Sequence, residues 1–383
     1  MIRVTKIISF FLVLITITAQ MSVLSFAERA DFTVDAKGAI LIEATTGKVL
    51  FEQNADEALP PASVTKVMTL LLVMEAIDNG QIKLTDMVTA SANATSMGGS
   101  QIYLKEGEQM TVEDMLKSVV IASANDAAVA LAEHLCGSED AFVKKMNEKA
   151  KELGMENTFF ENTNGLDDTT ERHLTSARDI AIMSAELIRH KKILEYSSIW
   201  MDTVRDGQFG LTNTNRLIRF YNGATGLKTG STSKAKFCIS ATAERGGMSL
   251  IAVIMGSPTR DIRNAEATKL LDYGFSNYGI YRDEGKELGE IKVLGGVKNA
   301  VKISHGDFSA VLESAKISNV KTDIEYAESI AAPIEKGEKI GKIIYSVNGE
   351  KIGENDIVCD EKIEKIGFFG VLSQIFKYFC LVR

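Results

Sequence analysis

Apolar positions along the chain change their spacing several times, and each change predicts a different kind of element. Residues 39–51 hold two short apolar runs on either side of Thr45-Thr46-Gly47, which predicts a β-hairpin. Apolar residues three and four apart then predict helices over about 64–74, 111–122, 139–153 and 176–190. Thr111 with the acidic residues after it, and Gly154, mark a helix start and a helix end.

The spacing of apolar residues changes again after Thr225-Gly226. Continuous apolar runs at 237–243 and 249–256 predict two strands, and a helix is expected over roughly 264–273. Strands at both ends of this part of the chain, with helices between them, predict one sheet packed against a helical cluster.

From residue 286 the pattern is one of short alternating strands, such as 301–303 and 343–347, with turns such as Asn348-Gly349. We therefore expect a small all-β domain over 286–361. A role as spacer or stalk is favoured over a binding role because no cluster of chemically active residues occurs there.

Both ends of the chain have the composition of segments that meet membranes. Arg3 and Lys6 precede an apolar run, and Ser25-Phe26-Ala27 supplies a small residue before Glu28, so residues 1–27 are expected to be a secretory signal. A retained N-terminal anchor is the alternative. Secretion predicts a protein that works outside the cytoplasmic membrane.

Residues 362–383 predict an amphipathic helix with apolar residues on one face, namely Phe368, Leu372, Ile375, Phe376 and Phe379. Its apolar part is shorter than the roughly 20 residues that a spanning helix needs. Aromatic and basic residues on such a helix favour the membrane interface. Docking of the helix on its own domain is the alternative.

Composition narrows the function classes. At 383 residues, with 45% hydrophobic and 25% charged residues, the chain can bury a large core and is expected to hold two domains. A formal net charge of −8 without a long basic run argues against nucleic acid as a partner. The cysteines and histidines show no metal-ligand spacing, so we expect no metal and no cofactor, and we favour free thiols, although sequence leaves all cysteine pairings open.

The strongest chemical signal is a serine and a lysine three residues apart. Ser-x-x-Lys occurs at Ser63, Ser231 and Ser233, and any one match is weak evidence. Only Ser63 and Lys66 stand at the start of an apolar helix, just after Pro60-Pro61-Ala62. Residues three apart share a helix face, and burial lowers the pKa of a lysine, so a neutral Lys66 amine is positioned to take the Ser63 proton.

Two further motifs accompany this pair. Ser123-Ala124-Asn125 lies between two apolar helical runs, where polar side chains must find partners or line a cleft; a structural turn is the alternative. Lys228-Thr229-Gly230 precedes the strand at 237 and is expected at a strand edge, where Gly230 leaves room for a substrate backbone. An ordinary hairpin turn is the alternative there.

The three motifs in this order are typical of class A β-lactamases and penicillin-binding proteins. Nearly the whole chain resembles the low-molecular-mass penicillin-binding proteins that act as D-alanyl-D-alanine carboxypeptidases, which are serine peptidases of the bacterial wall. The resemblance implies an α+β fold: a transpeptidase-like domain with an antiparallel sheet and a helical cluster, then a small all-β domain and a C-terminal amphipathic helix. The expected divisions are 28–285, 286–361 and 362–383.

The resemblance also implies roles. Ser63 would be the nucleophile that forms the acyl-enzyme, Lys66 its base, and Ser123 a proton relay within hydrogen-bond reach of Lys66 and Lys228. Asn125 would hold the substrate amide, and Lys228 and Thr229 would grip the terminal carboxylate. The backbone N–H groups of Ser63 and Ser231 would form an oxyanion hole. Arg263 could add to carboxylate recognition and His173 could border the site, with a structural role as the alternative for each.

The expected partners are a peptidoglycan stem peptide ending in D-Ala-D-Ala, β-lactam antibiotics, and a membrane surface held by the C-terminal helix. The expected location is the outer face of the cytoplasmic membrane, with peripheral anchoring. Two other functions remain open: a β-lactamase, although no Glu-x-x-Leu-Asn occurs between Ser123 and Lys228, and an inactive wall-binding protein. Whether water or an amine resolves the ester rests on the resemblance alone.

Overall fold

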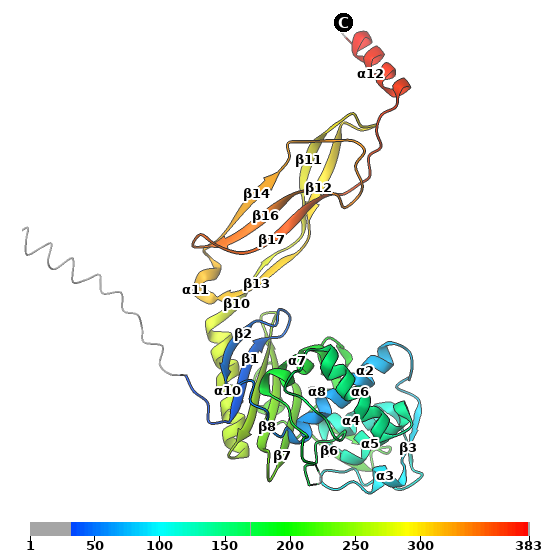
Figure 1. The fold of residues 1–383 in the computed structure, drawn as a ribbon, viewed down its shortest axis with the longest axis vertical. Helices are drawn as coiled ribbons and strands as arrows, with labels where there is room; N and C mark the ends of the chain where they lie inside the picture. Colours follow the sequence, from blue (N-terminus) through cyan, green and yellow to red (C-terminus); the bar gives the residue numbers. More distant parts are fainter. Residues whose placement is uncertain (1–31, 169, 382–383) are drawn as a thin grey trace, which may run out of the picture. The chain divides into compact units, whose positions relative to one another are not determined.

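The computed structural model of this chain describes residues 32–168 and 170–381 (Figure 1). The signal predicted at 1–27 lies outside the described residues. Among the four cysteines, Cys136, Cys238 and Cys359 are free thiols, as favoured from the sequence, and the Cys380 side chain lies outside the described residues.

A five-stranded sheet contains strands from both ends of the first 257 residues (Figure 1). Its order is β2-β1-β9-β8-β7 and every neighbouring pair is antiparallel. The strands are β1 (Gly38–Glu43), β2 (Val49–Gln53), β7 (Ala224–Thr232), β8 (Lys236–Arg245) and β9 (Met248–Ser257). The predicted hairpin at 39–51 and the predicted sheet are both confirmed.

Both faces of this sheet are covered, which explains why every residue of β1 is buried. Ile40 and Ile42 join the core of the helical cluster. Leu41 points the other way and lies close to Gly274 on α10 (Arg260–Asn277). α10 is longer than the predicted 264–273, because Thr259 caps it by accepting a hydrogen bond from the Ile262 backbone N–H, a start signal that the apolar spacing does not reveal.

The helical cluster surrounds one central helix. η1 (Ala62–Thr65) leads directly into α2 (Lys66–Asp78), which is apolar on nearly all sides and buried over most of its length. Around it are α4 (Val112–Ile121), α5 (Asn125–Cys136), α6 (Glu139–Glu152), α7 (Ala177–Leu187) and α8 (Lys192–Ser197). Helices α2, α4, α5, α6 and α7 confirm predicted ones, although the helix expected to reach 190 ends at Leu187, and the short helix α8 was not predicted.

Several short elements were not predicted. They are the pair β3 (Met87–Thr89) and β4 (Gln109–Thr111), the helices α3 (Ala92–Thr95) and α9 (Leu217–Phe220), and the hairpin β5 (Met201–Val204) and β6 (Phe209–Thr212). Their runs are too short to give a periodic signal. The β5–β6 hairpin matters most, because the chain that follows it enters the site described below.

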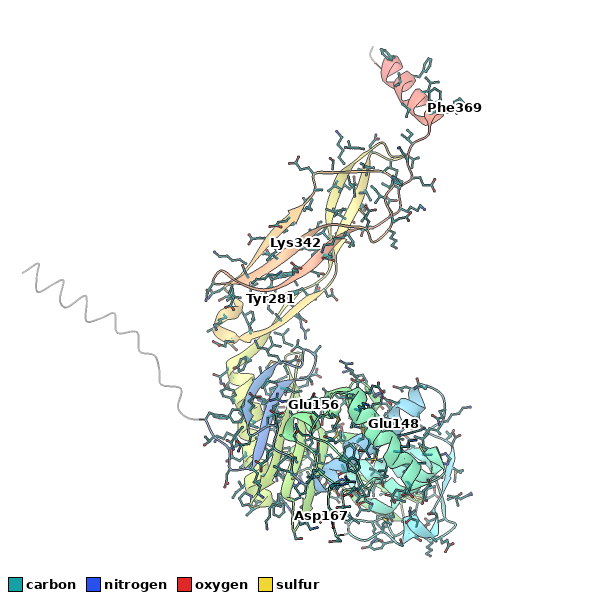
Figure 2. All side chains as sticks on the ribbon, viewed as in Figure 1. Glu148, Glu156, Asp167, Tyr281, Lys342 and Phe369 are labelled. Atoms are coloured by element: carbon teal, nitrogen blue, oxygen red, sulfur yellow. The ribbon has the colours of Figure 1, made fainter. Side chains whose placement is uncertain are left out.

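The part of the chain after α10 is rich in β-structure. β10 (Tyr278–Asp283) pairs with β13 (Phe308–Glu313). A six-stranded sheet has the order β14-β16-β17-β12-β11-β15, with α11 (Ser314–Ile317) between β13 and β14. Its strands are β11 (Lys286–Leu294), β12 (Ala300–His305), β14 (Val320–Tyr326), β15 (Ser329–Ala331), β16 (Lys339–Val347) and β17 (Glu350–Cys359). The aromatic rings of Tyr281 (Figure 2), Phe308 and Tyr345 pack together in this part.

The last element of the described residues is α12 (Phe368–Leu381). The side chains that the sequence places on one apolar face are all exposed, from 43% for Leu372 to 77% for Phe368, and the neighbouring Phe369 is exposed too (Figure 2). Among the described residues, no helix combines the length and the apolar character that crossing a bilayer requires.

Candidate active site

Ser63 and Lys66 lie where η1 joins α2. The Lys66 Nζ is 2.9 Å from Ser63 Oγ, 2.6 Å from Asn125 Oδ1 and 2.8 Å from the Asn164 carbonyl oxygen. The lysine side chain is fully buried, and no ion pair found among the described residues includes it. Burial, reinforced by the charge of Lys228 and opposed by that of Asp126, lowers the pKa of Lys66 well below 10.5. The arrangement thus holds an amine that loses its proton readily against a serine hydroxyl.

A chain of hydrogen bonds through His173 fixes the turn that carries Ser63. The Glu161 backbone N–H donates to His173 Nδ1 at 3.0 Å, so the proton of the neutral ring lies on Nε2, which donates to Thr65 Oγ1 at 2.7 Å. Thr65 in turn donates to the Ala62 carbonyl at 2.8 Å. Burial lowers the pKa of His173 to about 4, so the ring stays neutral near pH 7. Of the two roles left open for His173, its contacts favour support of the nucleophile turn.

Ser123 and Asn125 come from the connection between α4 and α5. Ser123 has a left-handed backbone, with φ of 62°, and its Oγ accepts a hydrogen bond from Lys228 Nζ at 2.9 Å. Asn125 is held at both ends of its amide, since Oδ1 accepts from Lys66 and Nδ2 donates to the Gly98 carbonyl at 2.7 Å. The expected reach of Ser123 to Lys228 is therefore present. Lys66 directs its hydrogen bonds to Ser63, Asn125 and Asn164 instead of Ser123.

The third motif lies on β7, the edge strand of the sheet, as predicted. Lys228 is buried and donates to Ser123 Oγ and to the Thr229 carbonyl, both at 2.9 Å. Burial and the nearby charge of Arg263 lower the pKa of Lys228 to about 7. Thr229 Oγ1 donates to Thr214 Oγ1 at 2.7 Å. An edge strand also offers unpaired backbone groups to an extended ligand.

Gly230 brings this strand against the nucleophile turn. A Cβ atom at residue 230 would lie 2.8 Å from the Ser63 backbone N and 2.8 Å from the Pro61 carbonyl oxygen, closer than real Cβ contacts allow. The strand and the turn can approach this closely only with glycine at this position. The backbone of β7 next to Ser231 is thereby placed beside the Ser63 N–H, as two donors to one oxyanion would require.

These segments line a cavity of about 390 Å³. Its walls include Ser63, Ser123, Thr229, Gly230 and Ser231, together with Ser100, Trp200, Thr212, Asn213, Thr214, Arg216, Arg260 and Arg263. The Arg263 side chain is buried, and its partners are the Asn264 amide oxygen and the Cys238 carbonyl. Burial lowers the pKa of Arg263 to about 10, so the group still carries its charge near pH 7. The cavity is suited to an anionic group.

Sequence reasoning missed several of these residues. Asn164, whose carbonyl accepts from Lys66, belongs to an Asn-Gly turn, which is a detectable signal. Gly165 there has φ of 86° and packs on the Ala62 carbonyl. Trp200, Thr214, Arg216 and Arg260 have no motif, because only the folded chain brings them to the cavity.

Comparison with known proteins identifies the family of this chain. The model of a family described as D-alanyl-D-alanine carboxypeptidase matches residues 25–259. The chain belongs to this family. A second model, described as the C-terminal domain of penicillin-binding protein 5, matches residues 276–365.

Individual relatives cover most of the chain. It is 44% identical over 353 residues to the D-alanyl-D-alanine carboxypeptidase DacF of Bacillus subtilis (strain 168), a match that covers 90% of both chains. Penicillin-binding protein 5 from Haemophilus influenzae has 34% identity and a TM-score of 0.75, over 87% of this chain and 99% of that one. Penicillin-binding protein D2 from Listeria monocytogenes, solved in its ampicillin-bound form, has 33% identity and a TM-score of 0.59, over 64% of this chain and 99% of that one. The expected family and fold class are thus confirmed.

Gly230→Ala tests the close approach of β7 to the nucleophile turn. The added Cβ must push the Ser63 N–H away from the strand. Because misplacement by about 1 Å can lower a rate about 100-fold, we expect acylation of Ser63 by a fluorescent penicillin to slow by about that factor. Gly210→Ala on β6, where no atom would lie within 4 Å of the new Cβ, is the matched control and should acylate at the normal rate. Equal rates in both variants would contradict the role of Gly230.

Proposed function

We propose that this chain is a serine-type carboxypeptidase that removes the terminal D-alanine of peptidoglycan stem peptides through an ester on Ser63. One observation carries the proposal. The buried Lys66 amine lies 2.9 Å from Ser63 Oγ, beside a strand edge that offers Lys228 and Thr229 to a carboxylate. The family to which the chain belongs and the names of its relatives support the same activity.

In the proposed reaction Ser63 Oγ attacks the carbonyl carbon of the penultimate D-alanine while its proton passes to Lys66. The carbonyl oxygen becomes an oxyanion that the backbone N–H groups of Ser63 and Ser231 stabilise, an effect worth about 10² to 10³ in rate per donor. The C–N bond then breaks and the leaving nitrogen needs a proton. Ser123 is the hydroxyl proposed to deliver it, because Lys228 occupies an acceptor site of its oxygen and leaves its own proton free. The proton that Lys66 took from Ser63 replaces the one that Ser123 gives up. Water then attacks the ester carbonyl and passes one proton to Lys66, and the Ser63 oxygen takes that proton as its C–O bond breaks.

The restriction to a free C-terminus is proposed to come from positive charge on one side of the cleft. Lys228, Thr229 and Arg263 would hold the terminal carboxylate, and Asn125 the amide that precedes it. A buried arginine whose hydrogen bonds go to an amide oxygen and a carbonyl supports this assignment, because a carboxylate would neutralise it. β-Lactams, which carry a carboxylate and a reactive carbonyl, are proposed to acylate Ser63 at the same place. The ampicillin-bound relative supports this.

The cellular setting belongs to the same proposal. We infer secretion after removal of residues 1–27 and peripheral attachment to the outer face of the cytoplasmic membrane through α12. The exposed aromatic side chains of α12, such as Phe368 and Phe376, support interfacial binding. The division of the chain at 28–285, 286–361 and 362–383 stays a prediction.

The direct test of the activity is release of free D-alanine from a Lys-D-Ala-D-Ala peptide. We expect steady release by the intact protein, none by Ser63→Ala, and normal release by Ser198→Ala, which removes an exposed hydroxyl elsewhere. A penicillin should form a covalent adduct with the intact protein and with Ser198→Ala only. Failure to release D-alanine would favour the inactive wall-binding protein, and fast β-lactam turnover without an adduct would favour the β-lactamase.

The pKa of Lys228 predicts how activity depends on pH. A lysine carries charge below its pKa, so raising the pH above about 7 removes the charge that grips the substrate carboxylate in the free enzyme. We therefore expect kcat/KM for Lys-D-Ala-D-Ala to fall above about pH 7, with a smaller effect on kcat, because the bound carboxylate raises the pKa of Lys228. In Lys228→Arg the charge of residue 228 does not titrate in this range, so kcat/KM should no longer fall above about pH 7. If kcat/KM of Lys228→Arg still falls above about pH 7, a group other than Lys228 is responsible for the pH dependence.

A further inference from the structure

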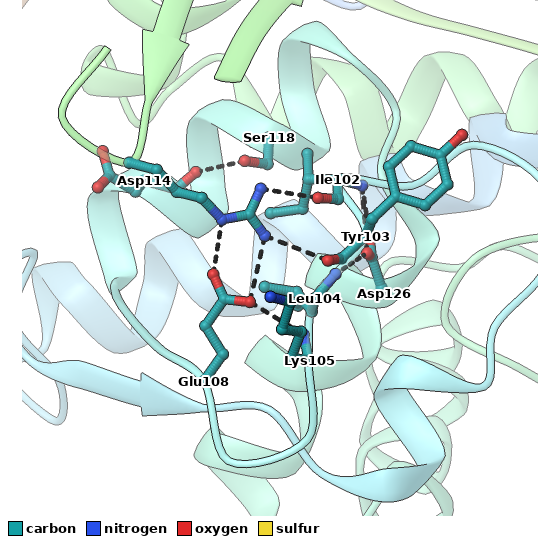
Figure 3. A network of polar contacts seen from close by, with 9 residues as sticks. Ile102, Tyr103, Leu104, Lys105, Glu108, Asp114, Ser118 and Asp126 are labelled. Carbon is teal, nitrogen blue, oxygen red and sulfur yellow. Dashed lines mark hydrogen bonds and ion pairs between the residues drawn. The ribbon is translucent and has the colours of Figure 1, made fainter. Parts of the chain in front are cut away.

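An exposed tyrosine stands beside the active site on a backbone that is held from two sides (Figure 3). On one side the Asp126 carboxylate accepts hydrogen bonds from the Ile102 backbone N–H, at 3.1 and 3.2 Å, and from the Leu104 N–H, at 3.1 Å. On the other side Arg205 donates to the Ile102 carbonyl at 2.8 Å and to the Tyr103 carbonyl at 3.4 Å. Glu108 fixes this arginine through two further hydrogen bonds.

The hydrogen bonds from Asp126 and Arg205 fix this backbone so that the side chains next to Tyr103 are buried and the Tyr103 side chain faces solvent. Ile102 is fully buried and Leu104 is 6% exposed, whereas Tyr103 is 70% exposed and its ring points away from the hydrogen-bonded groups (Figure 3). Tyr103 has φ of 58°, a conformation that suits Gly or Asn far better than an aromatic residue. An isolated exposed aromatic is ordinary. A rigidly held one in an unfavourable conformation adds nothing to the core, and rigid aromatics of this kind are typical of binding surfaces.

Tyr103 does not stand alone. Its ring meets the edge of Phe209 on β6, with centroids 6.4 Å apart, and the Arg205 guanidinium lies 5.3 Å from the Phe209 centroid. The two rings border a cavity of about 570 Å³. The charged and amide side chains around it are Lys105, Glu106, Glu108, Arg205 and Gln208. Cations and carboxylates balance there, so the surface offers hydrogen bonds without a net charge.

This cavity adjoins the catalytic cleft through shared segments of chain. The Asn125 backbone N–H donates to the Ser100 carbonyl at 2.7 Å, and Ser100 lines the cleft two residues before Ile102. On the opposite side, β6 carries Phe209 at one end and Thr212, another residue of the cleft wall, at the other. A polymer bound at the cleft would therefore pass this surface.

We propose that the exposed Tyr103 ring, braced edge to face by Phe209, is a stacking platform for a neutral sugar of the wall glycan to which the stem peptide is attached. Aromatic rings stack on the apolar faces of sugars, and the surrounding amide and charged groups match hydroxyl and acetamido groups. The balance of charge argues against an anionic polymer or an acidic peptide as the occupant. The inference rests on the proposed function for the identity of the polymer, and it adds the glycan as a recognised part of the substrate.

The first test compares two substrates that differ only in the sugar. One is a peptide ending in D-Ala-D-Ala, and the other is the same peptide on a short glycan of N-acetylated disaccharides. Tyr103→Asn removes the ring and suits the positive φ, so the backbone is retained. We expect its KM for the glycan-linked substrate to rise about tenfold, with kcat unchanged and the sugar-free peptide affected less than about twofold. Tyr103→Phe should behave as the unaltered protein.

The control is Tyr326→Ala, which removes a ring that is 46% exposed on β14 and lines neither of the two cavities. It should leave both substrates unaffected. An equal loss on both substrates in Tyr103→Asn would mean that Tyr103 positions the cleft, and no loss on either would mean that it contacts no glycan. Both results would overturn the sugar platform and leave the proposed carboxypeptidase activity standing.

A second measurement does not depend on catalysis. A tetramer of β-1,4-linked N-acetylglucosamine, titrated into the full-length Ser63→Ala protein, should shift NMR signals of Tyr103 and Phe209 at millimolar concentration. The additional change Tyr103→Asn should abolish the shift of the Phe209 signal, and Tyr326→Ala should not. Absence of binding to the Ser63→Ala protein would overturn the platform even if D-alanine release is normal. Binding without any D-alanine release by the intact protein would contradict the proposed function alone.

Discussion

The buried Lys66 amine is the constraint on which the rest of the structure depends. A charged ammonium in a dry interior is costly, so burial favours the neutral form that can accept a proton. Burial follows from the sequence, because Lys66 is the first residue of a helix that is apolar on nearly every side and occupies the centre of the fold. Its protein partners are a hydroxyl, an amide oxygen and a carbonyl, and these hold the amine in place without a carboxylate in direct contact to stabilise its charge. Helix α2 therefore both anchors the core and sets the chemistry.

Three segments must meet this amine, and each does so through a backbone that ordinary residues adopt reluctantly. Ala62 and Ser123 have positive φ, and Gly230 leaves no room for a side chain against the nucleophile turn. The strain at Ala62 and Ser123 costs of order 1–3 kcal/mol at each position and persists only where packing compensates for it. The compensation here is visible in the core beneath η1, in the His173 and Thr65 hydrogen bonds, and in the pairing of β7 with β8. The packing and hydrogen bonds gained on folding therefore keep these segments in the positions that the active site requires.

The sequence pattern predicts some parts of this arrangement and does not predict others. The hairpin, the sheet, the large helices and the three motifs carry local signals of period, capping or spacing, and all of these elements are found. The set of residues in the cavity wall is not predictable from local sequence, because Thr214, Arg216 and Trp200 reach the cleft through chain reversals that no window of sequence records. The Ser123 relay shows the same limit, since the family resemblance implied contact with both lysines and only Lys228 donates to it. Tyr103 escaped notice because an exposed aromatic in a loop has no period, and its unusual backbone appears only in three dimensions.

The central claim is that Lys66 is the neutral base for Ser63, and the pH dependence of acylation tests it most directly. The second-order rate constant for acylation by a penicillin should rise with pH. The rise should occur far below pH 10.5, the ordinary pKa of lysine, because Lys66 loses its proton there. Lys66→Arg, which keeps a positive charge and cannot accept the proton, should slow acylation by several orders of magnitude and abolish the rise. A rise near pH 10, or the same rise in Lys66→Arg, would contradict the account.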